Sequence, residues 1–424
     1  MNIWLVTIGE PVPDSVDFRG RLHRTGQFAL SFSKDAGIEW WTSAFDHFSR
    51  KFMAEDGASI QIGSGLRISV FRGCGYSSNV SVRRLLDQRI LAKKMYAAFS
   101  RASKLPDIIL CSVPPVGIAG VAVSFAGEAG VPVVLDLRDM WPDIFVDHAP
   151  SGLKSAAKLL LRPMFREAEK VFSRADALIG ITDEFLEWGL GKAGRERNNW
   201  DTVIPFAYNS VPPAGDTVDV AARAWDKLGI GEKHPFRVCF LGSLSRQFDI
   251  PTVIKASEML RARKIAVQFV ICGDGDCLRK FRKMAEGNPD VIFPGWVDAA
   301  AIYTLMRRSS AGIAPLPDRY DYLATINNKS VEYLSASLPI ISCPSKGALA
   351  RFLSERKCGV SFDYGRPELL AELIEGLTRS PGRLAQMSHN AKNAFEDNFV
   401  AEKVNSALLA HLERIVAEYK SAKN

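Results

Sequence analysis

The sequence has no arrangement of cysteines that would bind a metal or build a disulfide framework. Its seven cysteines are an odd number, and none shows the paired spacing of a metal site. Cys272 and Cys277 flank a glycine-rich turn, and we expect them to pack beside that turn. This use of cysteine indicates a reducing compartment, so a cytoplasmic location is expected.

Long apolar runs are also missing. The nearest approach to a membrane span, Val116 to Leu135, is interrupted by Glu128 and by glycines, whereas a spanning helix needs about 20 apolar residues. Residues 1–8 lack the basic start and the small-residue cleavage site of a signal peptide, so we interpret them as a first buried strand. The sequence contains no repeat and no low-complexity tract.

The overall composition is that of a globular enzyme with partners that carry phosphate. A chain of 424 residues is too long for one compact core, which predicts two domains. Its 47% hydrophobic and 24% charged residues are ordinary values. The net charge of +7 suits nucleotides, nucleic acid and anionic membranes alike, so charge does not choose among them.

Apolar runs and helical stretches alternate along both halves of the chain. In the first half, apolar runs begin at residues 3, 108, 133 and 177, and helices are predicted over 82–103, 116–129 and 153–172. In the second half, the runs are 238–241, 267–272, 291–293, 312–314, 340–342 and 359–362. Such alternation predicts an α/β fold in which two Rossmann-like domains each contain a parallel sheet.

Prolines and a glycine crowd the stretch 204–216, which is the candidate linker. We therefore predict an N-terminal domain over 1–205 and a C-terminal domain over 206–398. A last helix, within 399–424, is expected to cross back to the first domain.

One helix start carries more chemical information than any other part of the chain. Asn327, Asn328 and Ser330 are residues that favour helix caps. The unpaired N–H groups of a helix start, together with its partial positive charge, make it a site for phosphate, and Lys329 adds a full charge. Glu332 follows on nearly the same helix face, where its carboxylate can accept hydrogen bonds from ribose hydroxyls. These residue types predict a site for a nucleoside-diphosphate sugar.

Three loops that follow apolar runs of the second half are further candidates, because ligands of parallel sheets bind at the carboxyl ends of the strands. The first is a small-residue turn that can hold phosphate and is followed by a guanidinium. The second has a Gly-x-Gly pattern, which fits a tight turn equally well. The third ends in a tryptophan that suits a nucleobase, although burial in the core explains it better by itself. The candidate donor-binding residues in these loops are Gly242, Ser243, Arg246, Gly273, Asp274, Gly275 and Trp296.

The first half supplies weaker candidates. Arg138 and Asp139 end a buried strand, so they either pair with each other or face a cleft. Asp46 and His47 follow another strand, although a histidine beside two phenylalanines also fits simple packing. Three basic residues after the first strand, Arg19, Arg21 and Arg24, fit an acceptor diphosphate or a solvated basic face.

A basic stripe is predicted on the helix over 153–172. Two interpretations remain open: the helix lies on an anionic membrane, or it is a core helix with a solvated face, kinked at Pro163. The residues of the stripe are Lys154, Lys158, Arg162, Arg166 and Lys170.

Several of these segments together resemble a known family, the GT-B-fold glycosyltransferases of family 4. Within it, the subgroup with bacterial N-acetylfucosamine transferases of surface-polysaccharide synthesis is the most similar. The resemblance covers nearly the whole length. It is carried by Phe-Asp-His-Phe at 45–48, Pro-Asp-Ile-Ile at 106–109, Ser-Val-Pro-Pro at 112–115, Asp-Leu-Arg-Asp-Met-Trp-Pro at 136–142, Ala-Asp-Ala-Leu-Ile-Gly at 175–180 and Lys-Ser-Val-Glu-Tyr-Leu at 329–334.

The resemblance implies roles for individual residues. It places Glu332 on the second glutamate of the family's paired motif, at the donor ribose, and Lys329 near the diphosphate. Gly242 matches the glycine turn at the donor phosphates, and Arg138 stands where many members have a histidine close to the reacting sugar.

Two positions depart from the family pattern. The first glutamate of the paired motif is Ala324 here, and the basic pair that usually follows the glycine turn is reduced to Arg246. These departures leave the identity of the donor open.

We therefore expect a retaining glycosyltransferase with Arg138, Asp139, Lys329 and Glu332 as its catalytic residues. The resemblance implies a UDP-sugar donor and a lipid-diphosphate-linked saccharide acceptor at the cytoplasmic membrane face, with no metal, other cofactor or nucleic acid. The alternatives are a nucleotide-sugar epimerase and a non-catalytic binding partner. A dinucleotide oxidoreductase is disfavoured, because the first strand leads into Gly-Glu-Pro-Val-Pro at 9–13.

Overall fold

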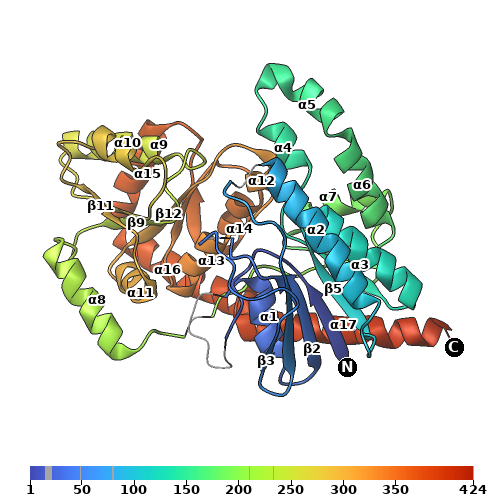
Figure 1. Cartoon of the computed structure of the whole chain (residues 1–424). Coiled ribbons are helices and arrows are strands. Elements are labelled where there is room, and N and C mark those ends of the chain that lie inside the picture. The colour runs from blue at the N-terminus through green and yellow to red at the C-terminus, as the bar shows by residue number, and fades with distance from the viewer. Residues whose placement is uncertain (15–21, 48, 79–80, 210, 233, 424) are drawn as a thin grey trace. The chain divides into compact units, whose positions relative to one another are not determined.

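The computed structural model describes residues 1–14, 22–47, 49–78, 81–209, 211–232 and 234–423. The chain forms two compact units (Figure 1). The N-terminal unit contains Met1–Pro205 together with Ala401–Asn424, and the C-terminal unit contains Phe206–Val400. Both units combine parallel strands with helices, which confirms the α/β fold of two Rossmann-like units.

The N-terminal unit is built on an eight-stranded sheet with the order β3-β4-β2-β1-β5-β6-β7-β8. All neighbouring strands are parallel except β3 and β4. The strand order reverses between β1 and β5. The strands are β1 Asn2–Val6, β2 Gly37–Ser43, β3 Ser59–Ile62, β4 Leu66–Phe71, β5 Ile108–Val113, β6 Val133–Leu137, β7 Ala177–Gly180 and β8 Thr202–Val203.

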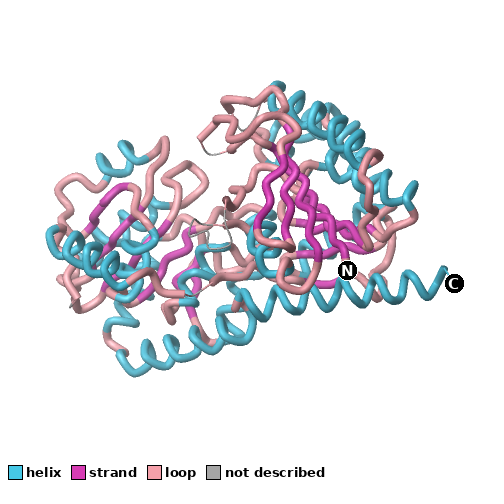
Figure 2. The backbone as a smooth tube through the Cα atoms, turned by 60° about the horizontal axis from the view of Figure 1, so that its bottom comes forward, coloured by secondary structure: helices cyan, strands magenta, loops and turns pink. Residues whose placement is uncertain are grey.

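Helices accompany this sheet (Figure 2). The strands β5, β6 and β7 are buried along their whole length. Such fully buried, mostly apolar strands are typical of parallel sheets with both faces covered. The last helix, α17, is anchored to this unit by the Lys420–Asp107 ion pair at 2.6 Å. The helices are α1 Arg24–Phe32, α2 Val82–Phe99, α3 Val116–Ala129, α4 Asp143–Asp147, η1 Ser151–Leu153, α5 Lys154–Leu160, α6 Arg162–Ser173, α7 Asp183–Ala193 and α17 Ala401–Lys423.

The C-terminal unit has a six-stranded, all-parallel sheet with the order β11-β10-β9-β12-β13-β14. Its strands are β9 Arg237–Leu241, β10 Gln268–Cys272, β11 Val291–Gly295, β12 Ala311–Pro315, β13 Ile340–Cys343 and β14 Gly359–Ser361. The helices are α8 Gly215–Lys227, α9 Ile250–Ala262, α10 Leu278–Met284, α11 Ala299–Arg307, α12 Tyr320–Leu323, α13 Asn328–Ser335, α14 Ala348–Arg356, α15 Pro367–Thr378 and α16 Pro381–Asn398.

Most of the predicted elements are present, but the single helix over 153–172 was wrong. The chain forms α5 and then starts anew as α6, with Leu161 as the residue between them. Pro163 lies in the first turn of α6, where its missing N–H costs nothing, and this favours a new helix start over a continuous helix. The predicted helix over 116–129 is confirmed by α3. None of the described helices has both the length and the apolar content needed to cross a membrane.

Candidate functional site

The C-terminal sheet has its reversal of strand order between β9 and β12, which are neighbours in the sheet. Open α/β sheets bind ligands where the strand order reverses, at the carboxyl ends of the strands. The loop after β9 begins at Gly242, and the chain after β12 continues through α12 to the start of α13. The predicted phosphate residues therefore come from the two strands that flank this point.

Lys329 and Gly242 lie in contact there. A Cβ added to Gly242 would lie 2.0 Å from Lys329 Cε and 2.8 Å from its Nζ. The Lys329 ammonium lies over the Phe248 ring, 4.1 Å from the ring centroid, a distance at which a cation is attracted to the ring face. Gly242 has φ +152°, in the range that favours glycine. The side chain of Lys329 is thus held against the turn where the sequence predicts phosphate.

The start of α13 is capped as predicted. Asn327 is the N-cap residue, and its Oδ1 accepts a hydrogen bond from Ser330 N at 3.0 Å. Ser330 is fully buried and its hydroxyl also donates to Asn327 Oδ1, so it supports the cap. Asn328 is exposed at the first helical position. This geometry aims the N-terminal end of α13, with its partial positive charge, toward the same edge as Lys329.

Glu332 lies deeper than its neighbours. Only 3% of the residue is exposed, and its Oε1 accepts a hydrogen bond from Tyr208 Oη at 2.9 Å. Tyr208 is held in the C-terminal unit, because its backbone N–H donates to Phe399 O at 2.9 Å. Tyr208 therefore fixes the orientation of the carboxylate that the sequence assigns to the donor ribose.

The loops after β9 and β10 approach each other so closely that the positions of Gly273 and Gly275 require glycine. A Cβ on Gly273 would lie 1.7 Å from the carbonyl oxygen of Gly242, and one on Gly275 would lie 2.5 Å from that of Leu244. Leu244 N donates to Asp274 O at 2.8 Å, which joins the loops directly. The Gly-x-Gly pattern thus has a structural role, and the two phosphate-loop candidates form one unit.

The remaining donor-site candidates are solvent-exposed. They are Ser243, Arg246, Asp274 and Trp296. Trp296 follows the end of β11 and is 76% exposed, so its interpretation as a core residue was wrong. An exposed indole beside the carboxyl edge of the sheet has the surface needed to contact a base.

Two buried polar atoms near the same edge have no hydrogen-bond partner among the described residues. They are Ser245 Oγ, in the loop after β9, and Asn327 Nδ2, at the cap of α13. Buried polar atoms in folded proteins are nearly always paired with protein, water or ligand groups. This pair adds one hydroxyl and one amide N–H to the groups able to bind an oxygen-rich ligand.

In the N-terminal unit, four charged side chains form a network, in which Arg24 and Asp136 are buried and Glu10 and Arg138 are half-buried. Arg138 Nε donates to Asp136 Oδ2 at 2.7 Å, and its Nη1 is paired with Glu10. Arg24 Nε also contacts Asp136 Oδ2, at 3.0 Å. Burial by itself would raise the pKa of Asp136, but Arg24 and Arg138 hold that pKa below its usual value. Two positive and two negative groups thus balance each other at the carboxyl edge of the sheet.

The predicted residues in and beside this network differ in solvent exposure. Arg24 is buried, and its guanidinium also donates to the backbone oxygens of Ile204 and Pro205, so it ties α1 to the end of the unit. Arg138 is half-buried, and its Nη2 donates to Thr25 Oγ1 at 2.9 Å. Asp139 Oδ1 accepts a hydrogen bond from Met140 N, and Arg138 pairs with Asp136, so the alternative in which Arg138 pairs with Asp139 is not the arrangement found.

His47 and Asp46 follow β2. His47 Nδ1 lies 2.7 Å from Tyr76 Oη and 3.1 Å from Arg50 Nη1. Burial, helped by the charges of Arg50 and Arg84, lowers the pKa of His47 to about 4. Asp46 accepts a hydrogen bond from Ser49 N.

The acceptor candidates are thus divided. Arg21, like Arg19, lies outside the described residues. Of the described candidates, Arg24 contacts Asp136, whereas His47 contacts Tyr76 and Arg50. Within the described ranges, no group of three or more His, Cys, Asp or Glu side chains is arranged to hold a metal ion.

The sequence prediction missed Glu10, Tyr208 and Phe248. A charge in the loop that follows the first buried strand was a usable signal for Glu10. Tyr208 and Phe248 gave no local signal, because each acts through a partner far along the chain.

Residues 235–380 match a family model described as glycosyl transferases group 1. The match includes Gly242, Lys329 and Glu332. No curated protein sequence is significantly similar to the chain.

Solved structures of the same architecture cover almost all of the chain. A sucrose-phosphate synthase from Thermosynechococcus elongatus has a TM-score of 0.73 and 13% identity, over 98% of this chain and 99% of that chain. HepE of Anabaena, in complex with UDP, has a TM-score of 0.65 and 15% identity, over 97% and 99%. The structure described as "Trehalose-6-phosphate from E. coli bound with UDP-2-fluoro glucose" has a TM-score of 0.67 and 14% identity, over 98% and 99%. At these identities the similarity establishes the fold, which is GT-B.

Proposed function

We propose that the chain is a glycosyltransferase that binds a nucleoside-diphosphate sugar on its C-terminal unit and transfers the sugar to an acceptor hydroxyl. The observation that carries the proposal is the cluster at the β9/β12 edge. There, the Lys329 ammonium lies against the Gly242 turn, near the Asn327-capped helix start. The family match of residues 235–380 supports the same reaction class. HepE binds UDP, which supports UDP as the nucleotide of the donor.

The proposed chemistry concentrates on the leaving group. The bond between the anomeric carbon and the phosphate oxygen breaks, and negative charge develops on the departing diphosphate. Lys329, Arg246 and the partial positive charge at the N-terminal end of α13 are suited to stabilise that charge. The acceptor oxygen bonds to the same carbon on the face that the phosphate leaves, with retention, and its proton passes to the departing phosphate oxygen. This scheme needs neither a metal nor another cofactor.

Glu332 and Trp296 complete the donor site in this proposal. Glu332, oriented by Tyr208, accepts hydrogen bonds from the ribose, and the exposed indole of Trp296 contacts the base. Ser243, Asp274 and the adjacent glycines approach the phosphates through their backbone. The sugar itself is a hexose or an acetamido sugar, in keeping with the N-acetylfucosamine transferase resemblance.

The acceptor is assigned to the N-terminal unit. The half-buried Arg138, with Asp139, follows β6 at the carboxyl edge of that unit's sheet, and Asp46 and His47 follow β2 of the same sheet. We assign the acceptor as a lipid-diphosphate-linked saccharide of cell-surface polysaccharide synthesis, used at the cytoplasmic face of a membrane.

One observation favours a second candidate function, a non-catalytic protein that binds nucleotide sugars. Ala324 is 1% exposed at the position where the resemblance places a glutamate near the transferred sugar. A methyl group there supplies no hydrogen bond to a sugar, so binding without turnover is the alternative outcome.

A two-stage experiment tests these candidates. Thermal unfolding is first measured with UDP-, GDP- and dTDP-sugars, because a ligand of the folded state raises its melting temperature. The stabilising donor, with a labelled sugar, is then incubated alone and with lipid-linked saccharides. Label on the lipid supports the transferase, a new sugar without acceptor indicates an epimerase, and binding without reaction indicates the non-catalytic protein. The proposal fails if no nucleotide sugar raises the melting temperature.

A further inference from the structure

The helix α5 exposes apolar side chains that a globular protein normally buries. None of its residues is buried. Leu159 and Leu160 are 70% and 81% exposed, and Leu153, just before the helix, is 58% exposed. The core-helix interpretation holds for α6, whose Phe165 and Phe172 are buried, but fails for α5. Figure 1 shows α5 extending away from the sheet of its own unit, joined to it through α4 and α6.

Positive charge surrounds these leucines. Between Asp147 and Glu167 the sequence has no acidic residue and four basic ones. Among the described residues, Lys158, Arg162 and Arg166 make no ion pair, while Lys154 pairs with Asp147 at 3.2 Å. The segment thus combines exposed apolar groups with cationic side chains that are available to an anionic surface.

A second group of exposed apolar side chains lies in the first turns of α2. Val82 and Leu86 are both more than half exposed. This end of α2 contacts the segment that leads to α5, because the Arg84 guanidinium lies over the Trp141 ring, 5.2 Å from the ring centroid. Trp141 contacts Phe145 of α4, and α4 packs against α5. The start of α2 and the helix α5 are therefore linked through a chain of contacts within the N-terminal unit.

We propose that this region, η1–α5 with the start of α2, is a docking surface for an anionic lipid bilayer. Leucines entering the interface and cations facing anionic headgroups are the two components of such binding. Charge complementarity favours a lipid surface over an apolar protein partner. The inference goes beyond the proposed function, because the surface would bind membranes whatever reaction the units perform. The start of α2 follows β4, and the segment η1–α5 follows β6. Both parts of the surface thus come after the carboxyl ends of strands of the N-terminal sheet, the edge assigned to the acceptor.

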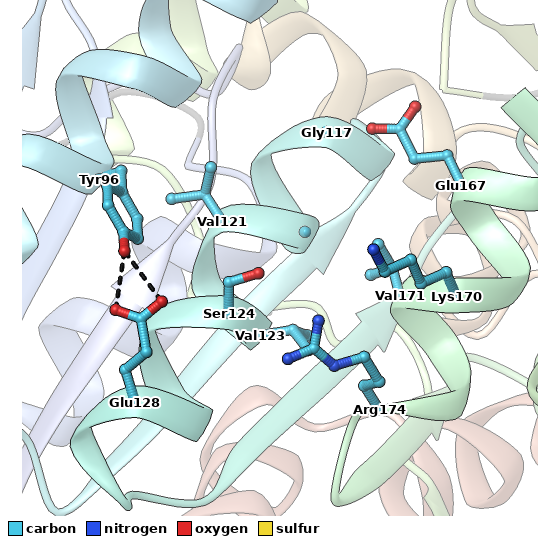
Figure 3. Close-up of a pocket in the computed structure, with 11 residues that line it drawn as sticks. Tyr96, Gly117, Val121, Val123, Ser124, Glu128, Glu167, Lys170, Val171 and Arg174 are labelled. Atoms are coloured by element: carbon cyan, nitrogen blue, oxygen red, sulfur yellow. Dashed lines mark hydrogen bonds between the residues drawn. The ribbon is translucent and has the colours of Figure 1, made fainter. Parts of the chain in front are cut away.

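A nearby pocket provides a matched control. Residues of α2, α3 and α6 line an open pocket (Figure 3) of about 450 Å³. Lys170 and Arg174 line it together with Glu167 and Glu128, and Glu128 accepts a hydrogen bond from Tyr96. Here two acidic groups balance two basic groups. Replacing Lys170 and Arg174 removes two positive charges, the same number as replacing two cations of the docking surface. The pair therefore controls for the effect of total charge.

The test is sedimentation of the full chain with vesicles of phosphatidylcholine, with and without phosphatidylglycerol, in the absence of any nucleotide sugar. We expect binding to the anionic vesicles only, weakened by salt. The Leu159→Ser/Leu160→Ser variant should bind about 10-fold more weakly or worse, and Lys158→Gln/Arg162→Gln about 10-fold more weakly. The control Lys170→Gln/Arg174→Gln should bind like the wild type.

The variants should keep the wild-type melting temperature, because every changed side chain is exposed. Absence of wild-type binding, or equal losses in all three variants, overturns the inference. A wild type that dimerises in solution and becomes monomeric in the leucine variant, without binding vesicles, also overturns it in favour of self-association. Donor-induced stabilisation is measured on the same proteins, so failure of the proposed function is recognised separately.

Discussion

The Lys329 side chain crosses the side of Gly242 that a Cβ would occupy, and brings its ammonium over the Phe248 ring. A residue after β12 is thereby held against the turn after β9. Because Gly242 has no side chain, the aliphatic stem of Lys329 packs against its backbone, and the Phe248 ring attracts the Lys329 ammonium. The proposed phosphate site follows from this contact.

The first prediction concerns the charge of Lys329. Lys329→Met keeps an unbranched stem against Gly242 but removes the ammonium, so we expect kcat/KM for transfer to fall about 100- to 1000-fold, the cost of losing one electrostatic donor. The melting temperature should stay close to wild type. Lys283→Met, an exposed lysine in the last turn of α10, is the control and should retain full activity. Equal activity in both variants would remove Lys329 from the mechanism.

The second prediction separates two glycines of the site. In Gly242→Ala the new methyl group meets the flexible end of Lys329, so stability should fall by only about 1 kcal/mol while donor affinity falls about 10-fold. In Gly273→Ala it meets the backbone oxygen of Gly242 at 1.7 Å. Backbone cannot move aside as a side chain can, so we expect a loss of about 3 kcal/mol or more. Urea unfolding and donor calorimetry on both variants test this; a reversed order contradicts it.

The third prediction compares two tyrosine hydroxyls. Tyr208→Phe removes the hydrogen bond that orients Glu332, so donor affinity should fall about 3- to 10-fold with little change in stability. Tyr333→Phe removes a buried hydroxyl that accepts from Leu241 N at 2.9 Å. That change leaves a buried N–H unpaired and should cost about 1–3 kcal/mol of stability. Unchanged donor affinity in Tyr208→Phe would show that Tyr208 does not orient a donor ligand.

The fourth prediction follows from the lowered pKa of His47, which burial and the nearby Arg50 bring to about 4. An unfolded histidine titrates near 6.5, so between these values the unfolded chain binds a proton that the folded chain does not. The contribution of neutral, buried His47 to the free energy of unfolding is fully present above about pH 6.5. It is lost as the pH falls toward 4, because protonation then favours the unfolded chain. His47→Gln should therefore lose less stability than wild type between pH 7 and 5. The exposed His389→Gln should retain the wild-type slope.

The fifth prediction concerns the buried charges of the N-terminal unit. Asp136→Asn leaves the Arg24 guanidinium buried without its carboxylate, and removing one partner of a buried pair typically costs about 3–5 kcal/mol. Replacing both partners, as Arg24→Met/Asp136→Leu, leaves Arg138 paired with Glu10 and should recover part of the loss. Thermal or urea unfolding measures both. A double variant less stable than Asp136→Asn would contradict this account.

The arrangement of strands and helices could be predicted because it depends on local patterns. Mostly apolar runs such as Ile108–Val113, alternating with helical stretches, predicted parallel sheets covered on both faces. The cap at Asn327 was equally visible, since the cap bond joins residues three positions apart. The exposure of Trp296 and of Leu160 could not be predicted, because hydrophobic side chains signal burial unless the surrounding surface is known.

By itself, the sequence determined the alternation of strands and helices, and with it the α/β class, together with the charge and capping of the α13 start. Only the tertiary structure decided which strands are neighbours. The order that sets β9 beside β12 brings Gly242 to Lys329, and the fold of the N-terminal unit joins Glu10 to Arg138. The physical reason is that periodicity and capping act over a few residues, whereas these contacts join residues far apart in the chain and exist only once the sheets have formed.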